Sequence, residues 1–136
     1  MQGIRILVVD DMPPMRTFVK AGIKTAVSKD IEVDEASNGE AAKGKLQLQR
    51  YDLVLCDWNM PGMKGSELLQ WMKEQEKLKD IPFVMVTAHN EKDIIMEAIK
   101  LGVRDYVLKP VTVDALGSKI KAVLMEAIAR KEKEVK

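Results

Sequence analysis

The chain has 136 residues, with 22 lysines and arginines against 21 aspartates and glutamates and a net charge of +1. This length predicts a single domain, and the near-neutral charge argues against a nucleic-acid partner. No apolar run is long enough to span a membrane, the N-terminus lacks the apolar core of a signal peptide, and Cys56 is the only cysteine. We therefore expect a soluble cytoplasmic monomer without disulfides.

Short apolar runs alternate with segments of helical periodicity along the chain. In order they predict a strand over 4–9, a helix over 13–28, a strand over 31–36, a helix over 38–48, a strand over 53–56, a helix around 68–72, a strand over 81–86, a helix over 91–101, a strand over 105–108 and a helix from 112. Residues 1–129 are predicted to form the domain, and the charged segment 130–136 a solvated tail that frays.

This alternation predicts an α/β protein with a five-stranded parallel sheet and helices on both faces. The doubly wound, flavodoxin-like strand order 2-1-3-4-5 fits the pattern. In that order the first and third strands are neighbours, so the residues that follow them meet at one edge of the sheet. Ligands of such sheets bind at the carboxyl ends of the strands.

Four of the predicted strands end in polar side chains: Asp10 and Asp11, then Asp57, Thr87 and Lys109. Three clustered carboxylates repel one another unless a cation compensates. Oxygen ligands of this kind suit Mg²⁺, and an aspartate can accept a phosphoryl group as an acyl phosphate. The lysine and the hydroxyl would then contact phosphoryl oxygens. Taken singly, each residue also has a structural interpretation, such as a salt bridge between Lys109 and Asp57.

The same residues resemble the receiver domain of two-component response regulators, most of all its stand-alone chemotaxis members. The resemblance covers nearly the whole chain. It rests on Asp10-Asp11, on Asp57 followed by Met60-Pro61 and Gly65, on Thr87-Ala88, and on Tyr106 with Lys109-Pro110.

The resemblance implies a role for each residue of the motif. Asp57 would be the phosphoacceptor, and Thr87 and Lys109 would contact the phosphoryl group. The ligands of Mg²⁺ would be Asp11 and Asp57 directly, Asp10 through water and Asn59 through its backbone carbonyl. Thr87 and Tyr106 would form a switch pair, and the bond before Pro110 would be cis.

The implied partners are a histidine kinase that donates the phosphoryl group, an output protein such as the flagellar motor switch, and a phosphatase. The protein itself would be no enzyme beyond self-catalysed phosphorylation and dephosphorylation. The output face is predicted around Ile95, Met96, Tyr106 and Lys119. One helix cannot bury Ile94, Ile95 and Met96 equally against a sheet, although a broad core face remains an alternative.

Other functions stay open at this stage. The chain could be the receiver of another phosphorelay or of a longer regulator. A magnesium-dependent phosphohydrolase would also use Asp57 as nucleophile, but Asn59 stands where such enzymes commonly carry a second acid. A flavodoxin is disfavoured because the acidic first loop would repel the FMN phosphate. His89 either lines the mouth of the site or is an exposed loop residue.

Overall fold

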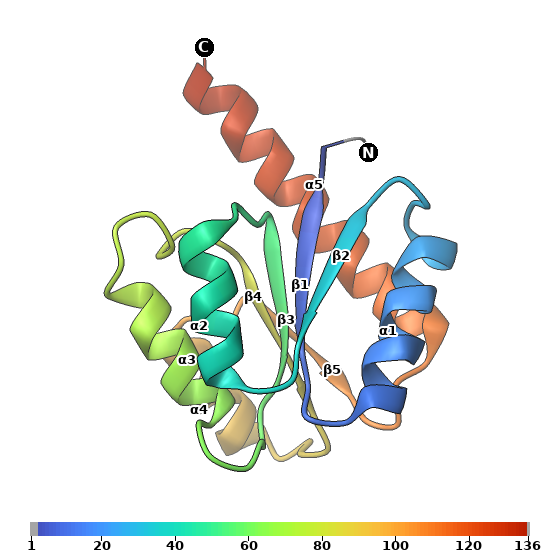
Figure 1. The fold of residues 1–136 in the computed structure, drawn as a ribbon, viewed down its shortest axis with the longest axis vertical. Helices are drawn as coiled ribbons and strands as arrows, with labels where there is room; N and C mark the ends of the chain where they lie inside the picture. The colour runs from blue at the N-terminus through green and yellow to red at the C-terminus, as the bar shows by residue number, and fades with distance from the viewer. Residues whose placement is uncertain (1–2, 136) are drawn as a thin grey trace.

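The computed structural model describes the backbone of residues 3–135 and the side chains of residues 3–130, and it shows five strands alternating with five helices (Figure 1). The elements are β1 Arg5–Val9, α1 Pro13–Ala26, β2 Glu32–Ala36, α2 Gly39–Leu48, β3 Leu53–Asp57, α3 Gly65–Lys73, β4 Phe83–Thr87, α4 Lys92–Leu101, β5 Asp105–Leu108 and α5 Val113–Val135. The predicted alternation is therefore confirmed.

The sheet is parallel throughout, with the strand order β2-β1-β3-β4-β5. This is the predicted doubly wound order. Because β3 and β4 are buried along their whole length, both faces of the sheet are covered, as their unbroken apolar runs indicate.

Alternation along the strands divides the core into two hydrophobic clusters, one on each face of the sheet. Leu53 and Leu55 belong to the cluster that packs against α1 and α5, whereas Val54 and Cys56 belong to the cluster that packs against α2, α3 and α4. Figure 1 shows the same division, with α2 and α3 on one side of the sheet and α1 and α5 on the other. The sheet backbone separates the two clusters.

Two helix ends follow the sequence chemistry directly. Asn38 is the N-cap of α2, and its side-chain oxygen accepts the Ala41 N–H at 2.8 Å. Gly102 ends α4 in the left-handed conformation with φ 114°, because a residue without a Cβ adopts this conformation at little cost.

The end of α5 differs from the expected fraying tail. The helix continues to Val135, and in Figure 1 its second half runs past the edge of the sheet. Lys and Glu have high helix propensity, which favours continuation where tertiary packing stops. The domain boundary after residue 129 stays a prediction, and Lys136 lies outside the described residues.

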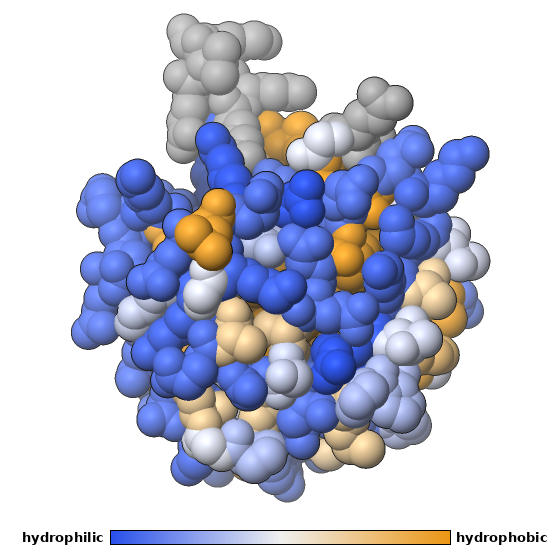
Figure 2. Space-filling model, viewed as in Figure 1, coloured by the Kyte–Doolittle hydropathy of each residue, from blue (hydrophilic) through white to orange (hydrophobic). Residues whose placement is uncertain are grey.

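The face in Figure 2 is mostly hydrophilic, with apolar residues scattered over it. Leu48, the last residue of α2, is 89% exposed because the helix ends there, beyond the reach of the core. Within residues 3–135 we find no helix with the length and apolarity needed to cross a membrane.

Candidate phosphoacceptor and metal site

The acidic residues meet because β1 and β3 are adjacent. Val9 pairs with Cys56 in the sheet, so the residues that follow them, Asp10 and Asp57, lie side by side at the carboxyl edge. Carboxylate oxygens of Asp10, Asp11 and Asp57 all lie within 4.8 Å of one another. The predicted cluster of three acids is therefore present in the structure.

These acids sit in unequal environments. Asp10 and Asp57 are each 4% exposed, whereas Asp11 is open to solvent. Burial raises the pKa of Asp10, and the Asp57 and Asp11 carboxylates raise it further, against the Met12 N–H and Lys109. The structure thus stores charge repulsion at this edge, and a bound cation would relieve it.

Lys109 and Thr87 approach the cluster from the neighbouring strands. Lys109 Nζ lies 3.3 Å from Asp57 Oδ2, and the Lys109 N–H donates to the Thr87 carbonyl at 2.8 Å. Thr87 is fully buried, and its Oγ1 accepts the His89 N–H at 3.1 Å. The bond between Lys109 and Pro110 is cis, as the resemblance implied. The ends of β1, β3, β4 and β5 thus place functional groups at the same edge.

The loop after Asp57 closes tightly over the end of β3. The Asn59 N–H donates to Asp57 Oδ1 at 3.3 Å, and the Gly65 N–H donates to the Trp58 carbonyl at 3.1 Å. A Cβ on Gly65 would lie 2.8 Å from the Asp57 carbonyl oxygen and 3.0 Å from Trp58 Cα. Glycine is therefore required where α3 begins, because the backbone approaches so closely.

The donor set fits Mg²⁺. It consists of carboxylate oxygens, with one exposed acid through which solvent can reach the site, and Mg²⁺ prefers one or two carboxylates plus water and phosphate oxygens. Neither of the softer ligand types takes part, since the Cys56 thiol is buried and His89 belongs to a different loop. Asn59 lies in the loop beside the cluster, and its role as a carbonyl ligand remains a prediction.

The remaining predicted residues belong to the loop after β4 and to α4, β5 and α5, and Lys119 Nζ pairs with Asp105 at the start of β5, 3.0 Å away. Tyr106 is half-buried against the cluster of α2, α3 and α4, and Lys119 Nζ lies 4.9 Å from its ring centroid. Met96 is 49% exposed, while Ile95 packs partly against the core. His89 is partly exposed, with Nδ1 3.5 Å from a Glu91 oxygen.

Sequence reasoning missed two features of the site and its surroundings. Arg16 donates to the Asp10 carbonyl at 2.7 Å, and the only sequence signal was a basic residue early in a predicted helix. Ile99 is 52% exposed on α4, close along the helix to Met96. Ile99 follows Ile95 by one helical turn, and the sequence did not show which of these two isoleucines is exposed to solvent.

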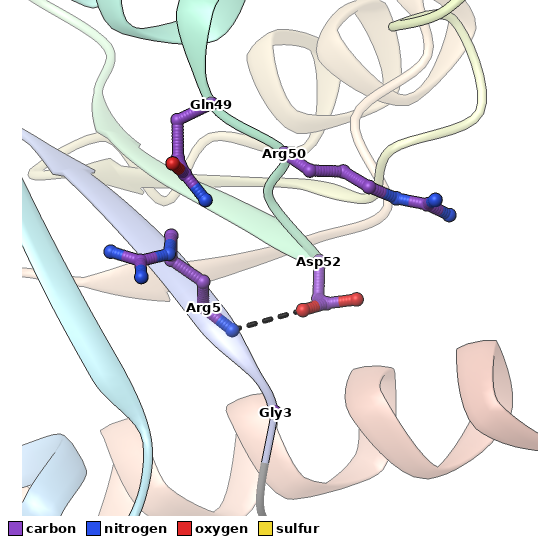
Figure 3. Close-up of a pocket in the computed structure, with 5 residues that line it drawn as sticks. All are labelled: Gly3, Arg5, Gln49, Arg50 and Asp52. Carbon is purple, nitrogen blue, oxygen red and sulfur yellow. Dashed lines mark hydrogen bonds between the residues drawn. The ribbon is translucent and has the colours of Figure 1, made fainter.

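A polar cavity of about 360 Å³ lies at the other end of the sheet (Figure 3). Gly3, Arg5, Gln49, Arg50 and Asp52 line it, and the Arg5 N–H donates to Asp52 Oδ2 at 2.9 Å. These residues precede or begin β1 and β3, so the cavity faces away from the acidic cluster.

A family model described as the response regulator receiver domain matches residues 6–121. The chain belongs to this family. It is a receiver domain of two-component signalling, a class of phosphorylation-activated switches that act as phosphoacceptors.

Within the family, the chain is 38% identical to the chemotaxis protein CheY of Pseudomonas aeruginosa, over 88% of this chain and 95% of that protein. It is 36% identical to the phosphate regulon transcriptional regulatory protein PhoB of the same organism, over 91% of this chain and 53% of PhoB. Among solved structures, the chemotaxis response regulator CheY4 of Vibrio cholerae superposes with a TM-score of 0.82 at 29% identity, over 89% of this chain and 98% of that one.

Proposed function

We propose that Asp57 is the residue that accepts the phosphoryl group, and that it does so from a histidine kinase. The observation that carries this proposal is the burial of its carboxylate between the Lys109 ammonium, 3.3 Å away, and the other two acids. An Asp57 oxygen attacks phosphorus, the bond from phosphorus to the donor nitrogen breaks, and an acyl phosphate forms. The leaving group is the histidine nitrogen of the kinase, which is released without its phosphoryl group.

The surrounding residues stabilise the group in transfer. Lys109 is close enough to exchange its contact with Asp57 Oδ2 for one with a phosphoryl oxygen. Thr87 has a hydroxyl proton left to donate, because its oxygen only accepts from His89. Asp11, Asp57 and the Asn59 carbonyl would hold Mg²⁺ directly and Asp10 through water, and the ion would supply charge neutralisation on the phosphoryl oxygens. The same set would support self-catalysed phosphorylation by small donors and slow self-catalysed dephosphorylation.

Thr87 and Tyr106 act in this proposal as the switch pair. Tyr106 pairs with Met85 across β4 and β5, and Thr87 lies two residues after Met85, so both side chains belong to the same face of the sheet. Donation by Thr87 to the phosphoryl group would draw its side chain toward the site and open space for the Tyr106 ring. Such a change occurs only if the phosphoryl group binds the two arrangements differently.

The output face lies on α4, β5 and α5. Met96, Ile99 and Leu108 are 49%, 52% and 39% exposed, and Lys119 lies over the half-buried Tyr106 ring. Together with Ile95, they give these three elements exposed apolar side chains beside a lysine whose ammonium also pairs with Asp105. We propose that an output protein reads this surface when Tyr106 moves.

The biological setting proposed is chemotaxis in the cytoplasm, with the flagellar motor switch as output and a phosphatase that resets the protein. Its support is the match to chemotaxis protein CheY along 95% of that relative. The PhoB match supports a second candidate, the receiver of a longer regulator, because the chain spans only 53% of PhoB.

The test is the intact mass of the protein after incubation with acetyl phosphate and Mg²⁺. We expect one added phosphoryl group in the wild type and none in Asp57→Asn, which keeps the size of the side chain. Excess EDTA should suppress the reaction, since three carboxylates would then face the donor without a counter-ion. A mass shift that survives Asp57→Asn would move the phosphoacceptor to another residue.

A further inference from the structure

Arg16 lies in the second turn of α1 and reaches back to the loop that carries the acid pair. Its Nη1 donates to the Asp10 backbone carbonyl at 2.7 Å, and its Nε donates to Glu35 Oε1 on β2 at 3.2 Å. The side chain is only 16% exposed. One guanidinium therefore links α1, β2 and the loop between β1 and α1.

This loop has other anchors, but they are backbone contacts or belong to Asp10 itself. The Asp10 N–H donates to the Ala36 carbonyl at 3.1 Å, and the Met12 N–H donates to Asp10 Oδ1 at 2.9 Å. Met12 is the N-cap of α1 and makes no side-chain cap hydrogen bond. Pro13 and Pro14 have no N–H to offer. The charge-assisted bond from Arg16 is thus a strong tie at the point where the acid pair begins.

We propose that Arg16 is a positioning residue for divalent-cation binding, because it fixes the backbone from which Asp10 and Asp11 project. The inference rests on the proposed function, since it concerns the same metal site. Contacts that orient ligands without touching the ion typically change metal affinity by 10- to 100-fold when they are removed.

The sign of the effect separates positioning from simple electrostatics. A positive charge near a cation site weakens cation binding, so removal of the Arg16 charge alone would tighten it. Glu35 pairs with Arg16, and its other oxygen lies 4.0 Å from Lys20 Nζ, so this region is already partly neutralised. Positioning predicts the opposite sign, which is weaker binding when Arg16 is lost.

The experiment titrates MgCl₂ against the wild type, Arg16→Ala, Arg16→Lys and Glu35→Gln, and follows the fluorescence of Trp58 beside the site. We expect the dissociation constant of Arg16→Ala to rise about tenfold. Lysine can reach one acceptor but cannot span both, so Arg16→Lys should restore part of the affinity. Glu35→Gln keeps an acceptor for Nε and should weaken binding by less than Arg16→Ala.

Arg5→Ala is the matched control. Arg5 also pairs with an acid on β2, Asp34, but it does so at the opposite end of β1. Its loss should lower the free energy of unfolding and leave the Mg²⁺ dissociation constant within about twofold of the wild type. If Arg16→Ala does not fold, Arg16→Lys carries the same test, with a rise in the dissociation constant that is smaller than tenfold but larger than that of Arg5→Ala.

Each outcome decides the matter. Unchanged or tighter binding in the Arg16 variants overturns the inference while the metal site stands. Equal weakening by Arg5→Ala overturns it in favour of a general loss of stability. A wild type that does not respond to Mg²⁺ and is phosphorylated equally well in EDTA overturns the proposed metal site together with the inference.

Discussion

Replacement of Asp10 by Asn should stabilise the metal-free protein while weakening its response to Mg²⁺. The amide has the same shape and keeps an oxygen that can accept the Met12 N–H. It removes the charge of a carboxylate that is 4% exposed and lies within 4.8 Å of the oxygens of Asp57 and Asp11. Stability without metal and affinity for metal therefore oppose each other at this position.

The size of the effect follows from the separation of the charges. Two like charges within 4.8 Å of each other repel by at least about 3.5 kcal/mol at an effective dielectric constant of about 20. Lys109 offsets part of this through Asp57, and Asp11 is screened by water. We therefore expect Asp10→Asn to raise the free energy of unfolding in EDTA by roughly 1–2 kcal/mol. Binding that is tenfold weaker would reduce stabilisation by Mg²⁺ by about 1.4 kcal/mol.

Urea unfolding at neutral pH, in EDTA and in excess Mg²⁺, measures both effects. Acid should erase the gain. The folded-state pKa of Asp10 is raised above 3.8, so its ionised form costs stability above that raised pKa, and the cost fades as the pH falls through it toward 3.8. Asp11→Asn, at the exposed acid, should give a smaller gain. Equal or lower stability of Asp10→Asn in EDTA would refute the reasoning.

The remaining predictions concern the switch, the far end of the sheet and the site loop. Thr87→Ala should still be phosphorylated but lose the gain in partner affinity, and an equal gain in a partner titration would rule out the switch. Tyr51→Phe removes a 2.6 Å hydrogen bond to Asp34 and should cost about 1 kcal/mol in urea unfolding at pH 7. Burial raises the pKa of Asp34, but the hydrogen bonds from Tyr51 and the Arg5 side chain outweigh it and lower this pKa below 3.8. The stabilisation from these bonds is present above pH 3.8 and is lost as the pH falls through the lowered pKa. The stabilities of the wild type and Tyr51→Phe should therefore converge in acid. Gly65→Ala should lower the free energy of unfolding by about 1–3 kcal/mol, because its Cβ would lie 2.8 Å from the last carbonyl oxygen of β3. A lower thermal midpoint would report this loss. Gly44→Ala, with open space around its Cβ, should instead stabilise α2 by up to about 1 kcal/mol.

The sheet and the acidic edge were predictable from sequence because the signals there are local and mutually consistent. A strand buried on both faces reads as an unbroken apolar run, and the polar residue that ends it marks the edge. Once the strand order is known, Asp57 and Asp10 are therefore predicted to lie together at the carboxyl edge of the sheet. Their spatial separation and unequal exposure depend on the register of β1 against β3 and had to come from the structure.

Features that depend on how a helix is rotated against the sheet, or on how far a long side chain extends, were not predictable from the sequence. Ile95 and Ile99 have the same chemistry and lie one turn apart, and the docking angle of α4 alone decides that Ile99 is the exposed one. Arg16 looks like any basic residue on an amphipathic helix until its partners, Glu35 and the Asp10 carbonyl, are seen to come from another strand and a loop. The backbone of α5 is helical to Val135, which the charge pattern of the last residues did not reveal, because a segment rich in Lys and Glu can also be helical.

The division of the core by the sheet bears on how this molecule can change by mutation. Substitutions in the cluster under α1 and α5 do not touch those in the cluster under α2, α3 and α4, so their effects on stability should add. Residues from both clusters meet at the carboxyl edge. By the alternation of β3, Asp57 lies on the same face as Leu53 and Leu55, which belong to the cluster under α1 and α5. By the alternation of β4, Thr87 lies on the opposite face, with Phe83 and Met85. The residues of one cluster can therefore be substituted without compensating changes in the other. Epistasis between the clusters is expected to concentrate in the few residues that share the edge.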